Sequence, residues 1–258
     1  MDLTMIHPQP SLLHRQIFDF GRLQMHAHHR ALLRDLEKHR RSRVHSQSND
    51  SYLRSGHHYL DVSVPMRRTI AKAWLKKNKG ITDSEFSAVL ESLYRGRFHE
   101  EKTLASILLS YHPTGRKMVG LSQLNAWLDD LVGWAEIDML CGGVFGAEEI
   151  LANWPRWERF ILALSHDRNI NKRRAALVLL TAPVRYSDDK RLADLGFEVI
   201  RLLQSEREII ITRAVSWLLR SMVRHHKRVV ATYLKRNLSS LPAVAVRETR
   251  RKIATGRK

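Results

Sequence analysis

The sequence predicts an all-α protein of the solenoid type, in which antiparallel helix pairs stack into one domain. After residue 59, nearly every segment repeats apolar residues at helical spacing over about 10–16 residues, with short polar joints between segments. No segment alternates apolar and polar residues as a strand would. Joints this short make neighbouring helices antiparallel, and many such pairs in a row favour two-helix repeats of ~40–47 residues. A compact, irregular helical domain is the alternative, because the segments resemble one another only weakly.

The predicted helices can be followed in order along the chain. Residues 1–20 show little periodicity and are expected to form an irregular N-terminal extension, which leaves 21–258 as a single helical domain. A basic helix is expected over 22–40, followed by a polar loop at 42–51. Pro65 occupies a favourable helix start, and TDSEF at 82–86 combines a capping residue with early acids. Further helices are expected at 82–94, 100–111, 121–131, 134–145, 155–165, 172–182, 188–203, 207–222, 227–236 and 241–253.

The composition indicates a polyanionic partner in a reducing compartment. Lys and Arg number 44 against 26 Asp and Glu, a formal charge of +18, which favours nucleic acid first and an anionic membrane surface second. Cys141 is the only cysteine, so an intramolecular disulfide and a multi-cysteine zinc site are excluded. The N-terminus lacks the pattern of a secretory signal, and the longest apolar run, 175–180, is too short to span a bilayer. We expect a cytoplasmic protein, nucleoid-associated if bacterial, with no membrane partner.

The segment 207–228 carries two contrasting faces when it is read as a helix. One face is an apolar core stripe of Ile211, Ala214, Val215, Leu218 and Met222. The other face holds an aromatic residue in a row of cations, Arg213, Trp217, Arg220 and Arg224. Trp217 either packs against the next helix beneath the arginines, or belongs to a face that binds a polyanion.

Three places along the chain have a spacing that matches the repeat. Trp134 and Asp138 lie four residues apart and share a helix face, and Arg174 and Trp217 follow at intervals of about 40 residues, one repeat each. Residues one repeat apart project onto the same inner surface of a solenoid, which predicts a concave basic groove holding an acid, two indoles and several arginines. Each residue also has a simpler explanation: packing for Trp134, a helix-start acid or ion-pair partner for Asp138, and an ion pair between repeats for Arg174.

Four motifs, YLDVSVPMRR, GWAEIDML, INKRRAALVLL and TRAVSWLLR, resemble in this order the HEAT-like-repeat alkylpurine DNA glycosylases, the AlkD-like DNA alkylation repair family, over about residues 22–253. The resemblance implies an α-solenoid that binds double-stranded DNA along its concave face. It implies hydrolysis of the N-glycosidic bond of cationic lesions such as N3-methyladenine and N7-methylguanine, without base flipping. It further implies a catalytic aspartate at Asp138, cleft tryptophans at Trp134 and Trp217, and a cleft arginine at Arg174. Gly133 and Ala135 replace an aromatic and a polar residue of the family motif, a departure that bears on substrate range and rate.

The expected DNA-binding set consists of the cations Lys172, Arg173, Arg213, Arg220 and Arg224, which would contact phosphates. No metal or other cofactor is expected, because the sequence has no phosphate-binding glycine loop and no metal-ligand cluster. The histidine pairs 57–58 and 225–226 are expected to face phosphate or solvent. We expect a monomer. The alternatives are a non-catalytic HEAT-repeat protein that recognises branched or distorted DNA and a protein-interaction scaffold, and the charge is equally compatible with RNA.

Overall fold

The computed structural model describes residues 25–40, 53 and 55–257, and over these ranges the chain is helical. An isolated bridge between His58 and Phe98 is the only β-type pairing in the described part, which contains no strand. The prediction of an all-α solenoid is therefore confirmed. The predictions for residues 1–20 and 42–51 lie outside the described residues.

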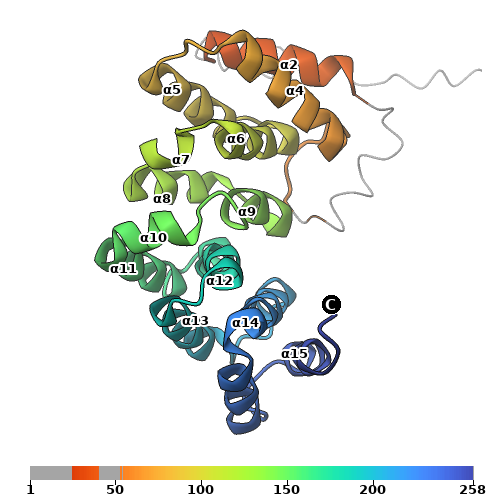
Figure 1. Cartoon of the computed structure of the whole chain (residues 1–258). Helices are drawn as coiled ribbons and strands as arrows, with labels where there is room; N and C mark the ends of the chain where they lie inside the picture. The colour runs from red at the N-terminus through yellow and green to blue at the C-terminus, as the bar shows by residue number, and fades with distance from the viewer. Residues whose placement is uncertain (1–24, 41–52, 54, 258) are drawn as a thin grey trace, which may run out of the picture.

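The helices form two rows that run side by side from the N-terminal to the C-terminal end (Figure 1). The first row consists of α4 (Val64–Lys77), α6 (His99–Tyr111), α9 (Gly133–Cys141), α12 (Ile170–Tyr186) and α14 (Ile209–Arg236), each packed on the next. The second row consists of α5 (Asp83–Tyr94), α8 (Leu121–Asp130), α11 (Trp154–Ser165) and α13 (Lys190–Leu203). Four further helices complete the described part: α2 (Ala27–Lys38) on α4 and α5, the short α7 (Gly115–Met118) and α10 (Ala147–Ala152), and α15 (Ala243–Thr255) on α14.

Local sequence signals set several helix starts. The Thr82 hydroxyl accepts a hydrogen bond from the Glu85 N–H at 3.2 Å. The Ser63 hydroxyl accepts one from the Met66 N–H, and Val64 and Pro65 are the first two residues of α4. The Asn169 side chain accepts from the Asn171 N–H at 2.9 Å and so begins α12. These caps satisfy backbone donors that the first helical turn leaves free.

Burial explains the two most apolar stretches of the sequence. The predicted core stripe of α14 is confirmed, because all five of its members are fully buried: Ile211, Ala214, Val215, Leu218 and Met222. The run 175–180 lies in α12 and is buried on every side, since α9, α11, α13 and α14 all pack around this helix. Among the described residues, no helix combines the length and the apolar character that crossing a bilayer would require.

Helix boundaries differ from the predictions at two places that matter for the site. The predicted helices 207–222 and 227–236 form one helix, α14, interrupted by a non-helical backbone at His226. The predicted helix 134–145 ends at Cys141, where the Gly142 N–H bonds back to the Asp138 carbonyl at 2.8 Å. Two glycines follow one another there, and neither favours continuing a helix.

Candidate active site

Helix α9 presents Trp134 and Asp138, and a glycine fixes where this helix begins. Gly133 has a φ of +81°, in the left-handed region that residues with a side chain rarely adopt. Its N–H donates to the Asn171 side chain at 3.0 Å, which ties the start of α9 to the start of α12. A residue with a side chain would be strained at this position. Trp134, which is half-buried, lies one helical turn before Asp138.

The Asp138 carboxylate is held by two parallel hydrogen bonds from Arg174 on α12. Arg174 Nε donates to Oδ1 at 2.9 Å and Nη2 donates to Oδ2 at 2.8 Å, while Nη1 donates to the Ile210 carbonyl on α14. Arg174 is buried, whereas the Asp138 side chain keeps 18% of its surface exposed. One guanidinium therefore connects three successive helices of the first row and fixes the orientation of a carboxylate that solvent can still reach.

Two opposing effects act on the acidity of Asp138. Burial raises the pKa of this carboxyl group, and the hydrogen bonds and positive charge of Arg174 lower it. The net shift of the pKa is upward from its ordinary value of 3.8. The partly buried carboxyl group therefore holds its proton more strongly than a surface aspartate does.

Trp217 lies against the turn that ends α9. A Cβ added to Gly142 would lie 3.1 Å from Trp217 Cη2 and 2.6 Å from the Asp138 carbonyl oxygen, so the indole edge and the backbone of Asp138 flank the same glycine. Trp217 is only partly buried. The structure thus places Asp138, Arg174 and Trp217 next to one another on α9, α12 and α14, although they come from parts of the chain about one repeat apart.

Lys172 and Arg173 form ion pairs with carboxylates of the protein. Lys172 is buried, with Nζ 2.6 Å from an Asp129 oxygen and 3.9 Å from Asp167. Arg173 donates twice to Glu206, at 2.7 and 3.1 Å, and to two backbone carbonyls. These two charges link α12 to residues near the ends of α8, α11 and α13, and their phosphate contacts stay a prediction.

The three arginines expected on the outer face of α14 differ in accessibility. Glu248 on α15 lies 3.8 Å from Arg213 and 3.4 Å from Arg220, and Arg220 is partly buried as a result. Arg224 is exposed, with its guanidinium 5.9 Å from the centre of the Tyr186 ring. Helix α15 therefore covers one flank of the face that the sequence predicted to be open.

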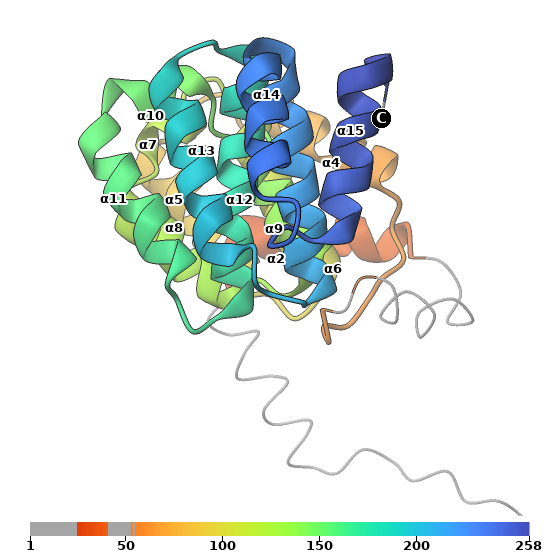
Figure 2. The same cartoon turned by 90° about the horizontal axis from the view of Figure 1, so that it is seen from below.

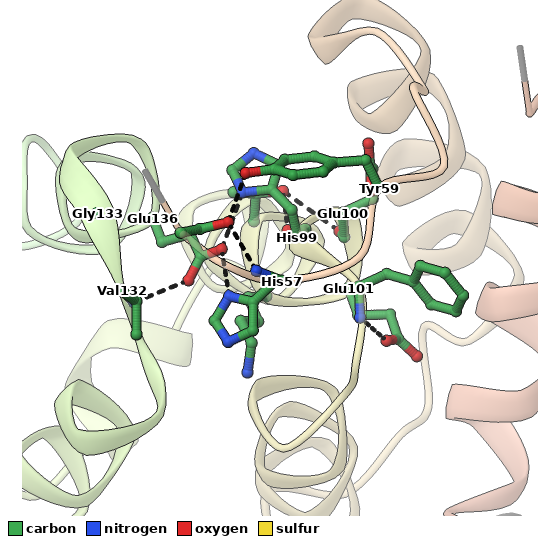
Figure 3. A network of polar contacts seen from close by, with 12 residues as sticks. His57, Tyr59, His99, Glu100, Glu101, Val132, Gly133 and Glu136 are labelled. Carbon is green, nitrogen blue, oxygen red and sulfur yellow. Dashed lines mark hydrogen bonds and ion pairs between the residues drawn. The ribbon is translucent and has the colours of Figure 1, made fainter. Parts of the chain in front are cut away.

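A second acid on α9, Glu136, lies at the centre of a buried polar network that sequence reasoning missed (Figure 3). His57 Nδ1 and His99 Nδ1 each lie 2.9 Å from Glu136 Oε1, and the Val132 N–H donates to Oε2 at 3.0 Å. Burial pushes the pKa of Glu136 upward, but the hydrogen bonds from His57 and His99, helped by the Val132 N–H, outweigh it, so the pKa is lowered overall. The network ties α9 to α6 and to the segment before α4.

The expectation that the histidine pairs face phosphate or solvent is wrong for His57, which contacts the carboxylate of the buried residue Glu136. His225 is exposed, as expected, with Nε2 3.1 Å from the Arg185 carbonyl. In the described part of the chain, no group of three or more His, Cys, Asp or Glu side chains is arranged to hold a metal ion.

Comparisons with known proteins identify the family and the fold. The family model described as "DNA alkylation repair enzyme" matches residues 32–253, which include every helix of the first row. A solved structure described as a predicted DNA alkylation repair enzyme from Enterococcus faecalis has the same fold, with a TM-score of 0.68 and 18% identity. The similarity covers 84% of this chain and 98% of that one. No curated protein matches the chain.

The family match spans nearly all of the helical chain. Three residues that the sequence analysis singled out, Asp138, Arg174 and Trp217, lie near one another on α9, α12 and α14. The chain belongs to the DNA alkylation repair enzyme family.

Proposed function

We propose that the protein is a monofunctional DNA glycosylase that hydrolyses the N-glycosidic bond of cationic alkylated purines in double-stranded DNA. The observation that supports this most directly is the pairing of the Asp138 carboxylate with Arg174, beside the turn at Gly142 against which the Trp217 indole lies. A purine methylated at N3 or N7 already carries a positive charge and leaves without a strong general acid. A single carboxylate is therefore sufficient for the chemistry.

The hydrolysis requires that the protein stabilise the positive charge that develops on the sugar. As the bond from C1′ to the base nitrogen breaks, its electron pair leaves with the base, which becomes neutral, and the deoxyribose becomes cationic. Asp138 stabilises that charge, and its low solvation strengthens the interaction. A water oxygen then bonds to C1′ and gives up a proton to the Asp138 carboxylate, which passes it on to solvent. A carboxylate has about four acceptor positions, so the two used by Arg174 leave others for this water.

Arg174 acts as a positioning residue in this mechanism. Its Nε, Nη1 and Nη2 donors are all engaged, two with Asp138 and one with the Ile210 carbonyl. Trp134 and Trp217 would face the cationic nucleotide, with cation–π contacts of ~0.5–2 kcal/mol each. Arg213 and Arg224, which are exposed on α14, would hold backbone phosphates. The lesion would stay stacked in the duplex while the acid approaches from the sugar side.

One observation favours a second candidate, a non-catalytic DNA-binding protein that recognises distorted DNA. Both oxygens of Asp138 are already paired with the same guanidinium, as they would be in a purely structural ion pair between repeats. This candidate predicts tight DNA binding without release of any base.

A base-release assay separates the two candidates. The full chain is incubated with a duplex treated with a methylating agent, and the free bases are quantified by mass spectrometry alongside an untreated duplex. The glycosylase proposal predicts release of N3-methyladenine or N7-methylguanine from the treated duplex, with no strand breaks before alkali is added. Binding to the same duplex without any release would contradict it and support the second candidate.

A further inference from the structure

A basic cavity lies beyond the candidate active site, where the C-terminal ends of α12 and α15 approach the middle of α14. Its volume is about 500 Å³. Figure 2 shows α14 and α15 side by side at this end of the molecule. Five cations line the cavity, namely Arg185, Arg220, Arg224, Lys227 and Lys252. No carboxylate is among the lining residues.

The negative ends of the helices around the cavity offset only part of this positive charge. Helices α12 and α15 end at Tyr186 and Thr255, and each of these C-terminal ends carries about half a negative charge. Lys252 neutralises one of them directly, because its Nζ donates to the Gly256 carbonyl at 2.6 Å. The two helix ends offset about one of the five positive charges, so most of the positive charge is left over.

Among the described residues, most of the other cations of the cavity have no acidic partner. In the residues that the structure describes, no carboxylate forms an ion pair with Arg185, Arg224 or Lys227. Arg220 does reach Glu248, at 3.4 Å. Its pKa is nevertheless lowered, first by burial and then by repulsion from Arg185 and Arg213, against the opposing attraction of Glu248. An anion in the cavity would relieve this crowding of like charges.

The cavity also has an aromatic residue at its edge and a defined position relative to Trp217. Tyr186 is 70% exposed and lies under the Arg224 guanidinium, a combination of ring and cation that suits a nucleotide. Arg220 and Arg224 follow Trp217 by three and seven residues on the same face of α14, or about 5 and 10 Å along the helix. For a DNA strand that runs parallel to α14, ten ångströms along the DNA axis correspond to about three nucleotides.

We propose that this cavity binds a phosphate group of the DNA backbone about three nucleotides from the lesion. Arg185 and Lys227, from α12 and from α14 beyond its interruption, would close around the phosphate, and Tyr186 would contact the adjoining sugar. The position relative to a lesion rests on the proposed function, whereas the affinity for backbone phosphate does not.

The test uses the double variant Arg185→Gln/Lys227→Gln of the full chain. Binding to a fluorescent undamaged duplex is measured by anisotropy over a range of salt concentrations. The matched control is Arg156→Gln/Arg159→Gln, which removes two exposed charges from α11 in the second row. The cavity variant should bind about tenfold more weakly and lose about 1 from the log–log salt slope for each cation removed, and the control variant should behave as wild type.

A shortened duplex tests the position of the cavity. For this measurement the duplex carries a single alkylated purine. Trimming it to within two base pairs of that purine on the cavity side should abolish the difference between the cavity variant and wild type, and trimming the other side should preserve it. Equal affinity and equal salt slope for the cavity and control variants would overturn the inference. If wild type releases no alkylated base but the cavity variant still binds DNA more weakly, the proposed function fails while the phosphate site stands.

Discussion

Removing Arg174 from its ion pair with Asp138 should cost about 2–4 kcal/mol of unfolding free energy. Removing one partner of a fully buried ion pair typically costs about 3–5 kcal/mol, because the other charge is left without compensation. The cost at this site is lower because Asp138 is 18% exposed, so that water can still solvate the carboxylate that is left. For a chain of this size, the loss corresponds to a fall in Tm of roughly 4–16 °C.

A double-mutant cycle isolates the pair from other effects of each substitution. Asp138→Asn, Arg174→Met and the double variant are unfolded with urea and followed by far-ultraviolet circular dichroism. We expect the double variant to lose less stability than the two single variants combined, with a coupling free energy of about 1.5–3 kcal/mol. The control cycle uses Lys190 and Asp194, a solvent-exposed pair on α13 at 3.2 Å, for which about 0.5 kcal/mol or less is expected. A coupling at Asp138 and Arg174 no larger than the control would refute the assignment of Arg174 as the group that positions the carboxylate.

Two further predictions concern α9. Because the pKa of Glu136 is lowered on folding, its ionised form stabilises the protein above the ordinary value of 4.5, and this stabilisation is lost as the pH falls through the lowered pKa. The difference in Tm between wild type and Glu136→Gln should therefore be largest near neutral pH and shrink below about pH 4.5, and a difference that is constant with pH would contradict the network. Gly142→Ala would bring a methyl group within 3.1 Å of Trp217 and 2.6 Å of the Asp138 carbonyl, so base excision should fall about tenfold or more as the indole and turn shift. Gly143→Ala is the control, since a Cβ there meets nothing within 4 Å, and equal excision rates for the two variants would count against the placement of Trp217.

The row of helices could be predicted because helical periodicity is a local property of the sequence. The stripe from Ile211 to Met222 indicated the buried face of α14 correctly. The end of α9 at Cys141 and the continuity of α14 through His226 could not be predicted in the same way, because they depend on how the flanking helices pack.

The candidate site was only partly accessible from the sequence. Repeat spacing correctly suggested that Asp138, Arg174 and Trp217 lie near one another, since residues one repeat apart occupy equivalent places in successive helix pairs. Spacing could not show which cations are free. Lys172 and Arg173 are neutralised by acids whose nearness depends on the packing of the second row against the first.

Glu136 illustrates a different limit. An acid that falls between Trp134 and Asp138 looks like an ordinary polar helix residue, and only the fold shows that His57 and His99 converge on it. The basic cavity around Arg185 and Lys227 likewise could not be predicted from the sequence, because it forms where the ends of α12 and α15 approach the middle of α14.

Single-turnover excision by Asp138→Asn tests the proposed chemistry most directly. An excess of enzyme is mixed with an alkylated duplex below the Tm of every variant, and the released base is followed together with DNA affinity. Asp194→Asn, an exposed substitution on α13, is the matched control. If Asp138 stabilises the sugar cation, its variant should excise at least about 100-fold more slowly while its Kd for DNA stays within about threefold of wild type. Excision at the wild-type rate by Asp138→Asn would remove this carboxylate from the reaction.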